Sequence, residues 1–174
     1  SGGRIMKRIK LLVLDVDGTL TDGGVYMDGR GGEFKRFDIH DGMGIVRLRA
    51  AGVRTAFLSG RRSEATAQRA ADLGVELLFN GVREKLPVLR SLLSDLSLSA
   101  EEAAYMGDDV NDVDCLRAAG LAFAPADAVP EAKSAADFVT SAKGGGGAVR
   151  EAAEHIISLN ARCEGRSSGA EERP

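Results

Sequence analysis

The sequence predicts an α/β protein with a Rossmann-like, mostly parallel sheet and helices on both of its faces. Short apolar runs alternate with longer segments of helical character between residues 10 and 160. The apolar runs lack the polar alternation of a strand that faces water on one side, so they are typical of strands buried on both faces. Polar clusters follow several of these runs, and the carboxyl ends of parallel strands are where such sheets bind ligands.

The predicted strands are short apolar runs, and each is separated from the next by a helix or a turn. They lie at residues 11–14, 53–58, 75–79, 103–106, 121–124 and 138–139. Helices are predicted at residues 44–51, 63–73, 84–96, 110–119 and 128–135, and from the glycine run 144–147 to about Asn160. Two short strands at residues 25–27 and 33–37, joined by a glycine-rich turn, predict a hairpin inserted after the first strand.

Length and composition indicate one globular domain, which we expect at residues 7–161, followed by a disordered tail of small and polar residues at 162–174. A net charge of −3 and an aromatic content of 5% argue against a nucleic-acid surface. No apolar stretch approaches the roughly 20 residues that span a bilayer, and no signal peptide is visible, so we expect a cytoplasmic protein without a membrane partner.

The pair Asp15 and Asp17 directly follows the first predicted strand and precedes Gly18 and Thr19. Two carboxylates at the end of a buried strand are unfavourable unless a cation or a reaction requires them. Taken alone, the pair could also cap a turn before Gly18. Its position at the predicted ligand-binding edge of the sheet favours a functional site.

A second acidic cluster, Asp108, Asp109 and Asp112, follows the predicted strand at 103–106. Three acids within five residues repel one another without a cation, which favours a metal site over a plain loop. Ser59 follows the strand at 53–58 and could donate a hydrogen bond to a phosphoryl oxygen, although it could also cap a helix. Lys85 could neutralise phosphate beside Asp15, or could be an ordinary solvated cation.

These residues, in this order, resemble the four motifs of the haloacid-dehalogenase-like phosphohydrolases. The resemblance implies that Asp15 attacks phosphorus and that Asp17 protonates the leaving oxygen and then activates water. Ser59 and Lys85 would stabilise the charge of the phosphoryl group.

The resemblance also implies a Mg²⁺ cofactor, because a carboxylate cannot easily approach a phosphate dianion without a hard cation between them. The implied ligands are Asp15, the backbone carbonyl of Asp17, and Asp108. The residues implied to support these ligands from outside are Thr19, Asp109 and Asp112.

The sequence has no insertion large enough for a cap domain. Four segments of the sequence are similar to one capless subfamily of these phosphohydrolases. They are the hairpin, the motif Phe37-x-x-x-Asp41-Gly42, the motif Ser59-Gly60-Arg61 and the run 144–151. This subfamily contains the 3-deoxy-D-manno-octulosonate 8-phosphate phosphatases of lipopolysaccharide biosynthesis and phosphatases of nine-carbon ketoacid phosphates. It implies a homotetramer in which a neighbour's hairpin helps to cover each site, and a capless monomer would indeed leave its site open to water.

By the same resemblance, a set of residues would contact a small sugar-acid phosphate: Asp17, Asp38, Ile39, His40, Asp41, Gly42, Gly60, Arg61, Arg69 and Lys85. Arg69 could equally be a surface charge. His40 and Val46 stand where some members of the subfamily carry a basic residue, which leaves the choice between eight-carbon and nine-carbon substrates open.

Two functions therefore follow as alternatives to hydrolysis of the eight-carbon substrate. One is a phosphatase of a nine-carbon 2-keto-3-deoxy sugar-acid 9-phosphate. The other is a non-catalytic oligomerisation module, against which the complete set of Asp15, Asp17, Ser59, Lys85 and Asp108 argues.

Overall fold

The computed structural model describes residues 7–168 and contains a six-stranded sheet in the order β5-β4-β1-β6-β7-β8. The strands are β1 (Leu11–Leu14), β4 (Arg54–Ser59), β5 (Leu77–Asn80), β6 (Ala103–Met106), β7 (Leu121–Ala124) and β8 (Phe138–Val139). All pairings between these strands are parallel. The predicted fold class is confirmed.

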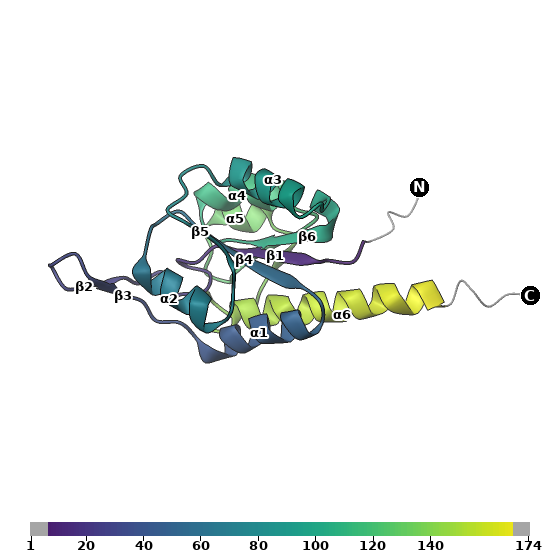
Figure 1. The fold of residues 1–174 in the computed structure, drawn as a ribbon, viewed down its shortest axis with the longest axis horizontal. Coiled ribbons are helices and arrows are strands. Elements are labelled where there is room, and N and C mark those ends of the chain that lie inside the picture. The colour runs from purple at the N-terminus through teal and green to yellow at the C-terminus, as the bar shows by residue number, and fades with distance from the viewer. Residues whose placement is uncertain (1–6, 169–174) are drawn as a thin grey trace, which may run out of the picture.

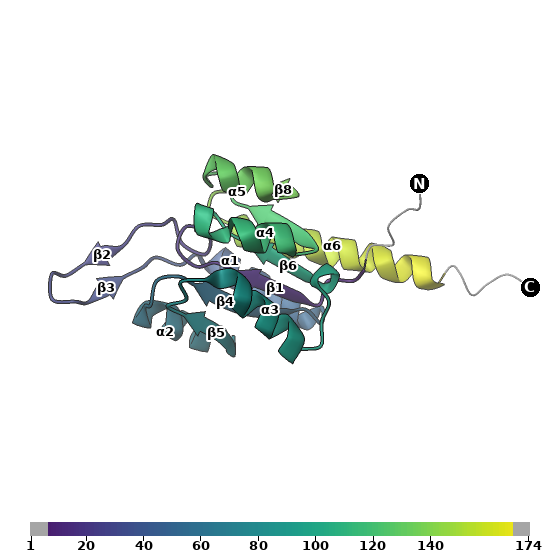
Figure 2. The same cartoon turned by 90° about the horizontal axis from the view of Figure 1, so that it is seen from above.

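Strand β1 lies in the middle of the sheet, and all four of its residues are fully buried. Leu12 and Leu14 belong to the core on one face, and Leu11 and Val13 belong to the core on the other. Three helices, α1 (Ile39–Ala50), α2 (Glu64–Asp72) and α6 (Ala148–Ser168), cover the first face. The other three, α3 (Lys85–Asp95), α4 (Val113–Ala118) and α5 (Pro130–Ala135), cover the second, as Figures 1 and 2 show. A strand with two covered faces explains the continuous apolar run in the sequence.

Most helices lie where the sequence predicted them. The chain also forms two 3₁₀ turns, η1 (Ala100–Glu102) and η2 (Val110–Asp112). Helix α1 begins five residues before the predicted start. The Asp38 side chain accepts a hydrogen bond of 2.7 Å from the backbone N–H of His40 and so caps this earlier start.

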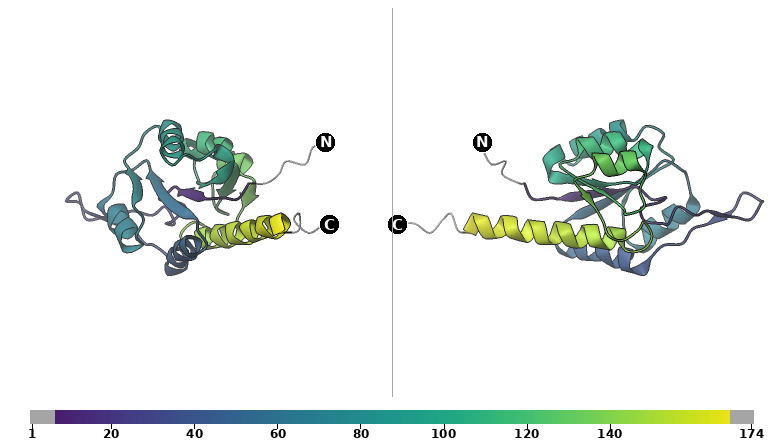
Figure 3. Two further views of the ribbon diagram at one scale, coloured as in Figure 1. Left: turned by 45° about the vertical axis from the view of Figure 1, so that its right-hand side comes forward. Right: turned by 180° about the vertical axis from the view of Figure 1, so that it is seen from behind.

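The predicted hairpin is present as β2 (Tyr26–Met27) and β3 (Glu33–Phe34), paired antiparallel, although its second strand is three residues shorter than expected. It projects from the body of the molecule at the end where β1 stops, as Figures 1 and 3 show. Tyr26, Met27 and Phe34 are 62%, 72% and 70% exposed. The hairpin therefore presents apolar side chains to solvent beside the carboxyl edge of the sheet.

Helix α6 does not end near Asn160, as predicted, but continues to Ser168. An ion pair between Arg8 and Glu164 holds its second half beside the chain that enters β1. The prediction of a disordered tail from Arg162 is thus wrong for residues 162–168, and residues 169–174 lie outside the described part of the chain. Within residues 7–168, no helix combines the length and apolar character needed to cross a membrane.

Asn160 connects α6 to the start of β1 through a pair of buried hydrogen bonds. Its Oδ1 accepts from the backbone N–H of Ile9 at 2.9 Å, and its Nδ2 donates to the backbone C=O of Ile9 at 2.8 Å. Asn160 is only 4% exposed. The Ile9 peptide groups have no strand partner there, so the side chain takes the place of a ladder contact.

Replacement of Asn160 by Leu keeps the branched shape of the side chain but leaves both Ile9 groups without their partners, and should lower the free energy of unfolding by about 2 kcal/mol. Urea denaturation followed by circular dichroism measures the change. Ser158→Ala, at an exposed position of the same helix, is the matched control and should change stability by less than about 0.5 kcal/mol. Equal stabilities for the two variants would contradict this role of Asn160.

Candidate active site

The chain turns sharply after β1 and places Asp15 at the carboxyl edge of the sheet. The backbone N–H groups of Thr19, Leu20 and Thr21 all donate to the carbonyl oxygen of Val16. Gly18 has a φ of +87°, and a Cβ on it would lie 1.9 Å from Oδ2 of Asp108. Glycine is required there both by the left-handed backbone and by the close approach of the second acidic segment.

Lys85, the first residue of α3, lies between two carboxylates in the interior. Its Nζ donates to Oδ1 of Asp15 at 2.7 Å and to Oδ1 of Asp112 at 2.8 Å. Lys85 and Asp15 are only 3% and 5% exposed. Burial alone would lower the pKa of Lys85, but Asp15 and Asp112 outweigh it and raise that pKa above its ordinary value. Lys85 is therefore a fixed positive charge, as its predicted role requires, and not a solvated surface residue.

Asp112 is fully buried and accepts hydrogen bonds at both of its oxygens. Oδ1 also accepts from the hydroxyl of Tyr105 at 2.6 Å, and Oδ2 accepts from the backbone N–H groups of Asp108 and Asp109 at 3.0 and 3.2 Å. These contacts hold the loop after β6 in place. Sequence reasoning missed Tyr105, whose place inside an apolar strand gave no sign of a polar contact.

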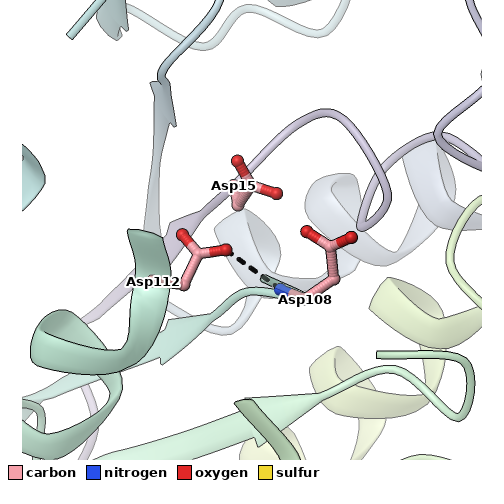
Figure 4. A group of neighbouring side chains, drawn as sticks. All are labelled: Asp15, Asp108 and Asp112. Atoms are coloured by element: carbon pink, nitrogen blue, oxygen red, sulfur yellow. Dashed lines mark hydrogen bonds between the residues drawn. The ribbon is translucent and has the colours of Figure 1, made fainter. Parts of the chain in front are cut away.

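Asp15, Asp108 and Asp112 each offer a carboxylate oxygen within 4.8 Å of the others, and Figure 4 shows the three side chains around one small space. Burial, together with the charge of Asp112, raises the pKa of Asp15. Burial, with Asp112 and Asp109, raises the pKa of Asp108 to about 6. Three carboxylates and one ammonium leave a net charge of −2, which one divalent cation would neutralise.

The donor set fits Mg²⁺. Carboxylate oxygens are the ligands that this ion prefers. Each oxygen of Asp15 accepts one hydrogen bond from the described residues, whereas each oxygen of Asp112 accepts two. Thr19 donates to Oδ2 of Asp15 at 3.3 Å and is fully buried. Asp109 is exposed, and its side chain instead caps the turn η2 through the N–H of Val110. The metal ligands stay a prediction, with Asp112 placed to orient them.

Ser59 lies at the carboxyl end of β4, beside β1, and is 1% exposed. Its hydroxyl donates to the backbone C=O of Arg61 at 2.9 Å. To donate to a phosphoryl oxygen, as predicted, the hydroxyl would rotate away from this contact. A Cβ on Gly60 would lie 3.3 Å from Nδ2 of Asn111 and 3.8 Å from Cε of Lys85, so the segment after β4 packs closely over the site.

Asp17 has a partner that sequence reasoning missed. Nζ of Lys35 lies 2.7 Å from Oδ1 of Asp17 and 3.7 Å from Oε1 of Glu33. Glu33 in turn accepts from Arg61, at 2.6 Å from Nη2 and 3.2 Å from Nε. Glu33 and Lys35 alternate on one face of the extended segment that leaves the hairpin, and this alternation was the available signal.

The predicted substrate-contacting segment at residues 38–42 lies at the start of α1. Ile39 and His40 are exposed, and His40 pairs with Asp38 at 3.3 Å. Asp41 is 1% exposed and accepts from the N–H of Arg150 at 3.0 Å, so it holds the first turn of α6. A Cβ on Gly42 would lie 2.5 Å from Nη2 of Arg69. Asp41 and Gly42 thus hold α1 against its neighbours.

The two predicted substrate arginines are in different environments. The Arg69 guanidinium lies 5.6 Å from the Phe37 ring centroid and reaches the C=O of Asp38 at 3.4 Å, so it packs beneath α1. Arg61 is about half exposed and pairs with Glu33. Their roles in substrate binding stay predictions.

The glycine run before α6 packs directly on the turn after β1. A Cβ on Gly144 would lie 1.9 Å from the carbonyl oxygen of Gly18, and one on Gly145 would lie 2.4 Å from the backbone nitrogen of Asp22. The N–H of Gly145 donates to the C=O of Thr19 at 3.1 Å. The run therefore supports the turn that carries Asp15 and Asp17.

The buried contact of Asp15 with Lys85, and carboxylates that could hold a divalent cation, lie at the carboxyl edge of a Rossmann-like sheet. This arrangement is typical of a phosphoryl-transfer hydrolase. The family model for haloacid dehalogenase-like hydrolases matches residues 75–152. Among curated proteins, 3-deoxy-D-manno-octulosonate 8-phosphate phosphatase KdsC of Haemophilus influenzae is 41% identical over 163 residues, covering 94% of this chain and 88% of that protein. The same phosphatase of Escherichia coli K12 is 40% identical over 91% of this chain and 84% of its own length.

Solved structures give the same result. One similar structure is that of 3-deoxy-D-manno-octulosonate 8-phosphate phosphatase from Moraxella catarrhalis, in complex with magnesium, phosphate and KDO. It matches this chain with a TM-score of 0.86 and 32% identity, and the match covers 94% of each chain. The cobalt-bound form of the Haemophilus influenzae phosphatase matches with a TM-score of 0.87 and 40% identity over 92% of this chain and 94% of its own. The chain belongs to the haloacid dehalogenase-like hydrolases, in the family of the 3-deoxy-D-manno-octulosonate 8-phosphate phosphatases, which are phosphoric monoester hydrolases.

Replacement of Gly144 by Ala should lower kcat/KM about 10- to 100-fold, because the new methyl group displaces the Gly18 backbone and with it Asp15 and Asp17, the predicted catalytic residues. Steady-state phosphate release measures the effect. Gly146→Ala is the matched control, since a Cβ there makes only an ordinary contact of 3.4 Å. Loss of activity in both variants, or in neither, would show that the close contact with Gly18 does not matter.

Proposed function

We propose that this chain is a Mg²⁺-dependent phosphatase that hydrolyses 3-deoxy-D-manno-octulosonate 8-phosphate to the free sugar acid and phosphate. The observation that carries the proposal is the buried Asp15 held 2.7 Å from Lys85 beside Asp108, in a chain 41% identical to a phosphatase named for that substrate. A non-catalytic module would have no reason to retain a buried lysine and three converging carboxylates.

In the first half-reaction, an oxygen of Asp15 forms a bond to phosphorus while the bond between phosphorus and the sugar oxygen breaks. Asp17, two residues further on, gives its proton to that leaving oxygen, so the sugar acid departs as an alcohol. Lys85 and the Ser59 hydroxyl donate hydrogen bonds to the phosphoryl oxygens. The product of this step is an aspartyl phosphate at residue 15.

In the second half-reaction, Asp17 takes a proton from water, and the water oxygen bonds to phosphorus as the bond to Asp15 breaks. Phosphate leaves, and both carboxyl groups return to their starting states. Bound Mg²⁺, held by Asp15, Asp108 and the Asp17 carbonyl, would supply the positive charge that lets a carboxylate approach a phosphate dianion. Throughout, Asp112 would keep Lys85 and the loop of Asp108 in position.

Phosphate release from the eight-carbon substrate with Mg²⁺ should exceed release from the nine-carbon analogue, and Asp15→Asn should abolish both because its amide cannot attack phosphorus. A coupled phosphate assay and removal of the metal with a chelator complete the measurement. A preference for the nine-carbon analogue would keep the chemistry and change the substrate. If neither substrate releases phosphate in an Asp15-dependent way, the proposal that this chain is a phosphatase is wrong.

We further propose that the chain acts in the cytoplasm as a homotetramer in which the hairpin of one copy lies near the site of another. The exposed Tyr26 and Phe34, which face each other across the hairpin, support an interface there. The absence of a cap domain supports it as well, because a site with no cover would admit water freely.

The variant Tyr26→Glu/Phe34→Glu should reduce the mass of the assembly from that of four chains, because it introduces two charges into the apolar surface. Light scattering after size exclusion measures the mass. Val139→Glu, at an exposed position on the edge strand β8, is the control and should leave the mass unchanged. An unaltered tetramer in the hairpin variant, or a wild-type monomer, would contradict the proposed assembly.

A further inference from the structure

Lys35 is a buried lysine that belongs neither to the Mg²⁺ site nor to the phosphate-binding groups described above. Its side chain is completely inaccessible to solvent, although Lys35 directly follows β3 of the hairpin. The hairpin itself projects from the molecule (Figure 1). A buried ammonium is unfavourable unless a negative charge compensates it. For Lys35 the compensating charge at 2.7 Å is Asp17, the proposed acid and base.

The contact also matters to Asp17. Within residues 7–168, Lys35 is the only ion-pair partner of Asp17, whose side chain is one-quarter exposed. Oδ1 of Asp17 is buried and accepts no hydrogen bond of good geometry from the described residues. Asp15, by contrast, has Lys85 and Thr19 as donors. The direction of the Asp17 carboxylate therefore depends on the position of one ammonium group.

Lys35 is itself held in place by Glu33, at 3.7 Å. Glu33 is fixed in turn by its two hydrogen bonds from Arg61, which belongs to the segment after β4. The charges alternate from Asp17 through Lys35 and Glu33 to Arg61. This chain of contacts connects the base of the hairpin to two strand ends of the sheet.

We infer that Lys35 is a positioning residue for the reaction: it holds the Asp17 carboxylate in the direction needed for proton transfer, and Glu33 holds Lys35. The inference rests on the proposed role of Asp17. It assigns to the hairpin a part in the chemistry of its own subunit, in addition to any part in assembly.

The test uses kcat/KM, which reports the first half-reaction, in which Asp17 protonates the leaving oxygen. A series of phosphate esters, from p-nitrophenyl phosphate to a simple alkyl phosphate, varies the need for that proton, because a nitrophenolate leaves readily without it and an alkoxide does not. Sugar-free esters are used so that contacts with the sugar acid do not enter. The full-length chain with Mg²⁺ is assayed throughout.

Replacement of Lys35 by Met should lower kcat/KM for the alkyl ester by about 10- to 100-fold, a part of the contribution of general acid catalysis. The loss for p-nitrophenyl phosphate should be within about threefold, since that ester needs little of this contribution. The dependence of log kcat/KM on leaving-group pKa therefore becomes steeper, as it should in Asp17→Asn. Lys35→Arg, which keeps the charge, should lose less kcat/KM for the alkyl ester than Lys35→Met. Arg30→Met, at an exposed position of the same hairpin, is the matched control.

Other results would overturn the inference in different ways. An equal loss of kcat/KM for every ester would mean that Lys35 only supports the fold. A thermal melt of Lys35→Met would then show a lowered melting temperature. The sugar-acid phosphate is assayed beside the series, and a loss confined to it would mean that Lys35 contacts the substrate. If Asp17→Asn leaves the dependence unchanged, the role of Asp17 fails and the inference fails with it. Failure of the phosphatase proposal is distinguishable, because wild-type protein would then release no phosphate in an Asp15-dependent way.

Discussion

The interaction on which the rest of the site depends is the buried contact of Lys85 with Asp15 and Asp112, at 2.7 and 2.8 Å. One ammonium holds together the end of β1 and the loop after β6, two segments that would otherwise repel each other. The ammonium compensates only one of the three negative charges of Asp15, Asp108 and Asp112. The two remaining negative charges favour the binding of a divalent cation. Removal of the lysine would leave buried carboxylates without a counter-charge, a strongly destabilising change.

The sheet makes this arrangement possible by bringing distant parts of the sequence to one edge. Because β1, β4 and β6 are parallel neighbours, Asp15, Ser59 and the Asp108 segment meet at their carboxyl ends. Gly18 and Gly144 then allow backbone and side chains from separate loops to approach within distances that any other residue would prevent. The glycines are therefore part of the site's geometry, although none of them carries a reactive group.

Sequence reasoning could predict the elements whose cause is local. The strand at residues 103–106 was predicted correctly because it is a continuous buried run. The early start of α1 was missed because Gly42 and Gly44 disfavour a helix; their tight contacts with Arg69 and with Arg150 of α6, visible only in three dimensions, explain them. Lys35 was missed for the same reason: its contact with Asp17 joins the hairpin to the turn after β1, and no local pattern encodes it. The acidic clusters were found because their charge repulsion is evident in the sequence itself.

The central claim is that Asp15 carries the phosphoryl group during turnover. Rapid mixing of enzyme, Mg²⁺ and substrate, acid quenching, and borohydride reduction would convert an aspartyl phosphate to homoserine, which mass spectrometry can locate. We expect homoserine at position 15, only when substrate and metal are both present, and none in Asp15→Asn. Homoserine at Asp17 or Asp108, or at no position while phosphate is released, would contradict the assignment of Asp15 as the nucleophile.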